Sequence, residues 1–442
     1  MNAICAYCVN LDAVCNVRAG DIYRLLPAGL STEEAEKMEI SLKGSITRME
    51  DLVSSLLYCM REGSGSEILI ESPDMASRIG EAFSWDIRLG GNAGIMANVL
   101  AHLGAKPILN APALGPRLAA LLHPGVLVPL FGALAVPRRV AEEMGPKEGY
   151  EPVHFVFQFS RGLEIKMGRN RFIVPEDDRF FASYDPVNTS LESSPDFDSY
   201  CLEHISDYAG ALVSGLHLVP LQKYRAVLQE KMDQLRSWKE SHPDLFIHME
   251  LGSFQSPRIF SHLLDLISQV PIDSLGMNED ELGAAAGLLQ ISAAGNPPFS
   301  WQERMHAAQS LQEKTGVLRV AVHTRDYILS VMNEGLLPTK DEIAALQSGV
   351  DSAASLAAGG SLLIEPPAQF NETGLAAAEE LCRQGASRYG RGAALHSGGR
   401  ILSLIPARQV LRPRITVGLG DTATASIFFR QLCAIKGHLG PV

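Results

Sequence analysis

The regular alternation of strand-forming and helix-forming stretches constrains the fold of this 442-residue chain more than any other feature. Short apolar, strand-forming runs occupy residues 211–214, 245–250, 318–323 and 401–405. Apolar residues recur at helical spacing in residues 221–239, 278–289, 301–315, 341–357 and 376–384. Such alternation predicts an α/β protein with a doubly wound sheet and helices on both faces. Ligands of these sheets bind beyond the carboxyl ends of the strands.

Composition and charge restrict the class of partner. A hydrophobic content of 46% allows a large core and, at this length, two or three folding units. The formal charge of -12 argues against non-specific nucleic-acid binding, which needs a basic face. No apolar run approaches the roughly 20 residues that span a bilayer, and the chain does not begin with a signal-like segment. We therefore expect a cytoplasmic protein without a membrane partner.

The seven cysteines indicate reduced thiols, because they are odd in number and lie mostly within apolar runs. Cys5 and Cys8 form a C-x-x-C pair. No second pair completes a zinc site, and this pair falls within a strand-forming run that extends over residues 4–14. We favour buried thiols over a metal or redox site.

The segment Gly418-Leu419-Gly420-Asp421 lies where a strand-forming region gives way to a helical pattern. Backbone N–H groups at a helix start are unpaired and the helix dipole adds positive charge, so an anion binds there without a lysine. Asp421 is placed to orient or deprotonate a hydroxyl beside that anion. The arrangement suits phosphoryl transfer to an alcohol. The structural alternative is an ordinary turn with Asp421 as a helix cap.

Two further acidic motifs fall at the ends of predicted elements. His248-Met249-Glu250 closes a strand, and Asn278-Glu279-Asp280-Glu281 opens a helix. Nucleotide-bound Mg²⁺ prefers oxygen ligands and keeps several waters, so one or two carboxylates acting partly through water suffice. Glu250 and Glu281 are the candidates. The alternative for the second motif is a capping asparagine followed by acids that the helix dipole favours.

Taken together, the motifs resemble the archaeal ADP-dependent sugar kinases, a family of the ribokinase-like superfamily. The resemblance also includes Asn10-Leu11-Asp12, the glycine-rich run at residues 90–98, and Val322-His323-Thr324. The motifs follow the family order and span nearly the whole chain. The resemblance implies a ribokinase-like α/β nucleotide-binding domain and a smaller α+β lid. The large domain would comprise residues 1–12, 90–150 and 186–442, and the lid residues 13–89 and 151–185.

The implied activity is transfer of the β-phosphoryl group of Mg-ADP to a sugar hydroxyl, with release of AMP. Asp421 falls on the catalytic base of the family, and the backbone from Gly418 through Gly420 falls on its anion hole. Glu250 and Glu281, together with Asp421, carry over as the residues that organise magnesium and its waters. The implied partners are a sugar and a nucleotide, and we expect a monomer or a weak homo-oligomer.

The resemblance also assigns residues around the nucleotide. Those on the nucleotide side are Asn278, His323, Val417 and Gly420. Arg171 matches a lid arginine that reaches across to the phosphates when the lid closes. The alternative for Arg171 is a surface arginine on a strand.

The implied sugar ligands are Asn10, Asp12, Glu67, Gly91, Asn92 and His154. Glu67 and His154 match residues with which glucokinases hold the unphosphorylated sugar. A carboxylate at the far end of the sugar would repel a substrate phosphate, so these two positions favour a neutral hexose, with glucose as first choice. The structural alternatives are a solvated loop acid for Glu67 and a strand-face cap for His154.

Some positions leave the substrate open. Residues that depart from the glucokinase pattern are Cys8, Asn92 and His217. Arginines crowd the predicted lid and suit a sugar phosphate: Arg161, Arg169 and Arg179. The prediction is an ADP-dependent glucokinase, with a phosphofructokinase or bifunctional enzyme as the nearest alternative. The alternative of another class is a catalytically silent nucleotide or sugar sensor, against which Asp421 and the two glutamates argue.

Overall fold

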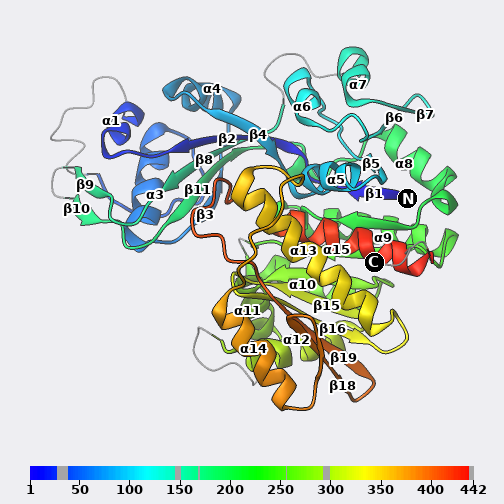
Figure 1. Cartoon of the computed structure of the whole chain (residues 1–442). Coiled ribbons are helices and arrows are strands. Elements are labelled where there is room, and N and C mark those ends of the chain that lie inside the picture. The colour runs from blue at the N-terminus through cyan, green and yellow to red at the C-terminus, as the bar shows by residue number, and fades with distance from the viewer. Residues whose placement is uncertain (27–37, 145–150, 168–169, 255, 292–298, 438–442) are drawn as a thin grey trace.

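The computed structural model describes residues 1–26, 38–144, 151–167, 170–254, 256–291 and 299–437, and it is built around two large sheets (Figure 1). The larger sheet has ten strands in the order β17-β18-β19-β16-β15-β14-β13-β12-β1-β5. Their bounds are β1 (Asn2–Ala6), β5 (Lys106–Leu109), β12 (Gly210–Val213), β13 (Phe246–Glu250), β14 (Ser274–Asn278), β15 (Arg319–His323), β16 (Tyr327–Asn333), β17 (Ser387–Tyr389), β18 (Gly392–Ser397) and β19 (Arg400–Pro406). The four predicted strand-forming runs correspond to β12, β13, β15 and β19.

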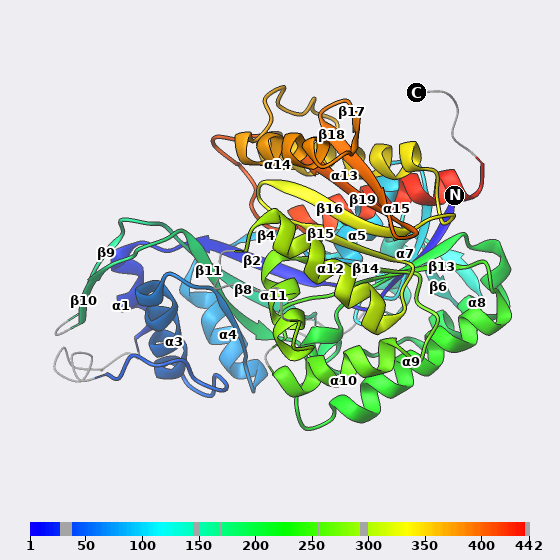
Figure 2. The ribbon, with the colours of Figure 1, turned by 90° about the horizontal axis from the view of Figure 1, so that it is seen from below.

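Helices cover both faces of the larger sheet because its strands are apolar on both sides. In β1, Ile4 belongs to one core and Cys5 to the other. The first face is covered by α8 (Pro195–Glu203), α9 (Tyr224–Ser241), α10 (Pro257–Ile267), α11 (Glu279–Leu288), α12 (Trp301–Thr315) and α14 (Glu372–Arg383). The second face is covered by α5 (Asn92–His102), α6 (Pro116–Leu121), α7 (Pro137–Met144), α13 (Thr339–Gly359) and α15 (Leu419–Ile435). Figure 2 shows strands between α10 and α13, which confirms the predicted α/β class.

The direction of the strands defines where a ligand site is expected. From β5 through β1 and β12 to β15 the neighbours are parallel, and beyond β15 they are antiparallel. After β1 the chain forms β5 on one side and later β12 on the other. Strand order therefore reverses at β1, and the carboxyl ends of β1 and β12 flank the switch point.

The smaller sheet has five strands in the order β3-β11-β8-β2-β4. Their bounds are β2 (Asn10–Asn16), β3 (Ser66–Leu69), β4 (Asp86–Gly90), β8 (Val153–Phe159) and β11 (Asp178–Tyr184). One face carries Phe155, Phe157 and Phe180, which pack in a core with α3 (Met49–Glu62) and α4 (Pro73–Ala82). Asp12 and Ser183 lie directly opposite His154 in register, so all three project from the other face.

The first strand-forming run differs from the prediction. It is divided into β1 of the larger sheet and β2 of the smaller sheet, and the chain crosses between the sheets at residues 7–9. Both strands are almost completely buried, so apolar periodicity cannot reveal the change of sheet. Asn10 and Asp12 therefore lie on β2. The predicted domain boundary at residues 12 and 13 falls within β2, and the division into domains stays a prediction.

No helix within the described ranges has the length and apolar character that crossing a membrane requires.

Candidate active site

A cavity of about 300 Å³ lies between the carboxyl ends of the larger sheet and the polar face of the smaller one. The strands β13, β14 and β15 end in Glu250, Asn278 and His323, which all line the cavity. The N-termini of α5 and α15 lie beside these strand ends and contribute Asn92 and Asp421. Of the residues predicted for the site, all except Arg171 line this cavity. The cavity residues on the smaller sheet include Asn10, Asp12, Glu67, His154 and Arg179.

The structure does not bring Arg171 to the cavity. Arg171 is exposed on β10 (Asn170–Ile173), which pairs with β9 (Glu164–Met167) in a two-stranded hairpin at the outer end of the smaller sheet (Figure 1). It is not among the described residues that line the cavity. The arginine that lines the cavity is Arg179 on β11, and its Nη1 donates a hydrogen bond to the carbonyl oxygen of Thr416 at 3.2 Å. Arg161 is exposed beside Glu176, so it does not join Arg179. Arg169 lies outside the described residues.

Glycine allows the start of α15 to approach the neighbouring strand. Gly418 has a φ of 74°, a left-handed conformation that favours glycine. A Cβ atom on Gly420 would lie 2.9 Å from Cε1 of His323, so a side chain there would displace the histidine. The first N–H groups of α15 have no partner within the helix and are available to an anion.

Asp421 is a half-buried carboxyl group whose pKa is raised toward neutrality. Burial raises its pKa to about 6, and the charges of Glu250 and Asp12 act in the same direction. Nδ2 of Asn92 donates a hydrogen bond to Oδ1 of Asp421 at 2.6 Å, which fixes the carboxyl group and opposes the rise. A carboxylate with this pKa can accept a proton at neutral pH and return it to solvent.

Beside Asp421, the half-buried His323 forms an ion pair with the buried Glu250. Nε2 of His323 lies 2.8 Å from Oε1 of Glu250, and Oγ1 of Thr424 donates to Oε2 at 3.0 Å. Burial would raise the pKa of Glu250, but hydrogen bonds from His248 and His323 outweigh it and lower the pKa to about 2. Burial would lower the pKa of His323, but its hydrogen bond to Glu250 and the charge of Glu250 raise it to about 9.

Glu281 combines a structural role with a place in the cavity. The backbone N–H and Nδ2 of Asn278 donate to the carboxyl group of Glu281 at 2.9 and 3.0 Å, and Asn278 caps α11. The capping interpretation is therefore confirmed, although both residues also line the cavity. Burial raises the pKa of Glu281 to about 7, and the charges of Glu250 and Asp421 add to the rise.

These carboxyl groups suit a hydrated cation better than a metal cage. Among the described residues, no three His, Cys, Asp or Glu side chains are grouped closely enough to hold a metal ion. The carboxyl groups of Glu250, Glu281 and Asp421 nevertheless lie close enough for their charges to interact. The charge of Glu250 raises the pKa of both Glu281 and Asp421. Such a donor set fits a divalent cation whose other ligands are water and phosphate oxygens. The metal role of these residues stays a prediction.

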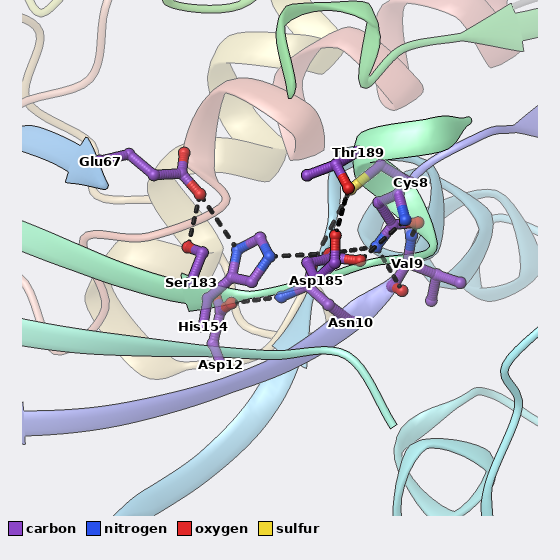
Figure 3. Close-up of polar contacts among 10 residues, drawn as sticks. Cys8, Val9, Asn10, Asp12, Glu67, His154, Ser183, Asp185 and Thr189 are labelled. Atoms are coloured by element: carbon purple, nitrogen blue, oxygen red, sulfur yellow. Dashed lines mark hydrogen bonds and ion pairs between the residues drawn. The ribbon is translucent and has the colours of Figure 1, made fainter. Parts of the chain in front are cut away.

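The polar face of the smaller sheet forms the opposite end of the cavity (Figure 3). Oγ of Ser183 donates to Oε1 of Glu67 at 2.6 Å, and Nδ1 of His154 lies 3.6 Å from the same oxygen. Nδ2 of Asn10 donates to Oδ1 of Asp12 at 2.8 Å. This end therefore presents fixed carboxylate and amide groups, which suit the hydroxyls of a sugar.

Sequence reasoning missed Asp185, whose carboxylate lies 2.9 Å from Nε2 of His154. The available signal was weak: Asp185 follows β11 directly and precedes Pro186, where a turn also favours aspartate.

Comparisons with known proteins agree with this geometry. Residues 1–430 match the family described as the ADP-specific phosphofructokinase/glucokinase conserved region. The ADP-dependent glucose/glucosamine kinase of Pyrococcus furiosus is 27% identical over 445 residues, which cover 96% of this chain and 93% of the relative. The ADP-specific phosphofructokinase of Pyrococcus abyssi is 27% identical over 452 residues, which cover 98% of each.

A solved structure of a hypothetical ADP-dependent phosphofructokinase from Pyrococcus horikoshii aligns with a TM-score of 0.81 over 99% of both chains, at 24% identity. This likeness supports the ribokinase-like fold class predicted from the sequence. With the family match over nearly its whole length, the chain belongs to the ADP-specific phosphofructokinase/glucokinase family and is an ADP-dependent sugar kinase.

Proposed function

We propose that the protein is an ADP-dependent glucokinase, which transfers the β-phosphoryl group of ADP to the 6-hydroxyl of glucose. The observation that carries this choice is the charge of the cavity. Its described lining residues include five carboxyl groups, those of Asp12, Glu67, Glu250, Glu281 and Asp421, against three basic groups, Arg179 and the two histidines with raised pKa values, His154 and His323. A phosphate on the acceptor would meet carboxylates at the end formed by Asp12 and Glu67, so a neutral hexose fits better.

Hydroxyl groups of the sugar match the donors and acceptors at that end. Glu67 is ordered by Ser183, and a carboxylate accepts hydrogen bonds from sugar hydroxyls. Asn10 offers both a donor and an acceptor beside Asp12. Gly91 has a φ of 76° and leaves no room for a side chain, since a Cβ atom would lie 2.6 Å from the Cα of Val9.

Asp421 is the proposed base. Its carboxylate takes the proton of the 6-hydroxyl, the hydroxyl oxygen forms a bond to the β-phosphorus, and the bond from that phosphorus to the bridging oxygen breaks. AMP leaves with that electron pair. The free N–H groups at the start of α15 bind the transferred group, and the imidazolium of His323 adds positive charge nearby. The rate then depends mainly on positioning and charge neutralisation.

Magnesium is part of the proposal, because the carboxyl groups near Asp421 fit a hydrated cation. When bound with ADP, the ion would neutralise negative charge on the phosphates. Glu250 and Glu281 would hold its waters. Both side chains are already oriented by the protein, Glu250 by His323 and Thr424 and Glu281 by Asn278.

A second candidate is phosphorylation of fructose 6-phosphate. Arg179 lines the cavity and offers a cation to a phosphate. Relatives named ADP-specific phosphofructokinase, from Pyrococcus abyssi and Methanosarcina acetivorans, also cover nearly the whole chain.

A matrix of donors and acceptors separates these activities. ADP and ATP are each combined with glucose, other hexoses or fructose 6-phosphate, and AMP and ADP release are measured. We expect AMP from ADP and glucose, with a kcat/KM for glucose at least about tenfold above that for fructose 6-phosphate, a difference of roughly 1.4 kcal/mol. A higher value for the phosphorylated sugar would establish the second candidate instead. No nucleotide turnover with any acceptor would support a silent sensor.

A further inference from the structure

His154 lies between two carboxylates that come from different elements (Figure 3). Glu67 on β3 and His154 on β8 both line the cavity. Asp185 is 4% exposed and is not among the lining residues. Asp185 therefore contacts the ring of His154 on the side away from the cavity and the proposed sugar.

The hydrogen bonds of Asp185 determine how the ring of His154 is oriented. Its Oδ1 accepts from the backbone N–H of Asn188 at 2.7 Å, and its Oδ2 accepts from Nδ2 of Asn188 at 2.5 Å. The same Oδ2 lies 2.9 Å from Nε2 of His154. Because both oxygens of Asp185 accept hydrogen bonds from Asn188, Asp185 acts as the acceptor and Nε2 of His154 supplies the hydrogen. The other ring nitrogen, Nδ1, is thereby directed toward Glu67 and the cavity.

Asn188 joins this arrangement to the point where the chain passes between the two sheets. Its Nδ2 donates to the carbonyl oxygen of Val9 at 3.0 Å, and its Oδ1 accepts from the N–H of Val9 at 3.3 Å. Val9 lies in the crossing from β1 to β2, and Asn188 begins η2 (Asn188–Ser190), after β11. Asn188 is 2% exposed. Its side-chain amide bonds to both the N–H and the carbonyl oxygen of Val9, as the backbone of a neighbouring strand would.

We propose that Asp185 and Asn188 are positioning residues for the sugar acceptor, which hold the ring of His154 with Nδ1–H directed at the sugar. The inference rests on the proposed function in one respect, that the acceptor binds beside Glu67 and His154. Burial alone would lower the pKa of His154, but the hydrogen bond with Asp185 and the charge of Glu67 raise it to about 9. Both ring nitrogens then carry hydrogens, and Nδ1–H is a charged donor for a sugar oxygen.

Asp185→Asn tests the inference with little change in volume. We expect the KM for the acceptor hexose to rise about tenfold to a hundredfold, the range for losing a buried hydrogen bond to a charged group. The KM for ADP and kcat should change by less than about twofold, because neither depends on the orientation of His154. An unchanged acceptor KM, or an equal rise in both KM values, would overturn the inference.

Asp51→Asn is the matched control. Asp51 is also buried, lies in the α3 region behind the same sheet, and accepts hydrogen bonds from Thr47 and Arg48. It does not line the cavity. We expect this variant to lower the melting temperature and to leave the acceptor KM unchanged. A control that raised the acceptor KM as much as Asp185→Asn would overturn the specific role of Asp185.

A double-mutant cycle with His154→Gln distinguishes positioning from general destabilisation. If Asp185 acts through His154, then Asp185→Asn should add less than about twofold to the acceptor KM of His154→Gln. Independent, multiplicative effects would overturn the inference.

A spectroscopic measurement avoids the risk that Asp185→Asn does not fold. In the full-length wild type without substrate, ¹⁵N NMR of histidine, with His154 assigned by its loss in His154→Gln, should show hydrogens on both ring nitrogens near pH 7. A neutral ring, with either nitrogen unprotonated, would overturn the inference. If the wild type failed to phosphorylate glucose, the proposed function would be wrong, whereas this NMR result would be unaffected.

Discussion

The two ends of the cavity each hold a histidine among carboxylates, but they balance charge differently. His154 at the acceptor end lies between Glu67 and Asp185, and its pKa is raised to about 9. His323 at the nucleotide end has a pKa raised to a similar value by Glu250. There, however, two further carboxyl groups have no cation of their own within the described part of the chain, and their pKa values are raised, to about 7 for Glu281 and about 6 for Asp421.

This difference indicates what each end requires from its ligand. The acceptor end is completed by the protein and offers oriented hydrogen-bonding groups to a neutral molecule. The nucleotide end holds excess negative charge at a helix N-terminus, so it requires added positive charge before anionic phosphates bind there. Magnesium bound with ADP would supply that charge. The comparison thus separates a proposed sugar site, which the protein forms by itself, from a proposed phosphate site, which the bound ligand would complete.

The largest effect should come from the nucleotide end. Asp421→Asn removes the proposed base and keeps the size of the side chain, so we expect kcat to fall roughly 10²- to 10⁴-fold. Binding of ADP, measured by calorimetry, should persist because the N–H groups of α15 remain. Activity within about tenfold of the wild type would mean that Asp421 is not the base.

The acceptor end should show a smaller and selective effect. Glu67→Gln removes the charge but keeps the shape of the side chain, so we expect kcat/KM for glucose to fall about tenfold to a hundredfold. The value for fructose 6-phosphate should fall less or rise, because a carboxylate that repels its phosphate is gone. Steady-state rates with both sugars measure the ratio, and an equal loss for both would contradict selection by Glu67.

The smallest effect concerns stability and depends on pH. Since folding raises the pKa of Asp421 from 3.8 to about 6, its stabilising contribution is present below pH 3.8 and is lost as pH rises through about 6. The Asp421→Asn variant has no carboxyl group that titrates at this position, so its stability does not fall for this reason as pH rises. It should therefore be more stable than the wild type above pH 6, by at most about 3 kcal/mol, and the advantage should shrink toward pH 4. Denaturant unfolding at both pH values measures it, and an advantage independent of pH would exclude this cause.

Much of the site could be predicted because its residues occupy the ends of regular elements. Glu250, Asn278 and His323 end strands, and Gly418 precedes a helix, so local pattern and the strand-end rule place them together. Parallel strands gather these ends at one edge, even though the residues are far apart in sequence.

Other features depend on contacts that no local pattern contains. The division of the first apolar run into β1 and β2 is set by pairing with β12 and β8, which lie far along the chain. Arg171 and Arg179 both follow strand periodicity, and only the pairing of β11 with β8 places Arg179 at the cavity. Asp185 is recognisable only once β8 and β11 lie side by side.

The central claim is that Asp421 acts on the sugar hydroxyl beside the N–H groups at the start of α15. A crystal structure with glucose and a non-reactive ADP analogue, in the closed form, tests it most directly. We predict a carboxylate oxygen of Asp421 about 2.6–3.2 Å from the 6-hydroxyl, with the β-phosphoryl group against the first turn of α15. An Asp421 side chain that faces away from both the sugar and the nucleotide would contradict the account.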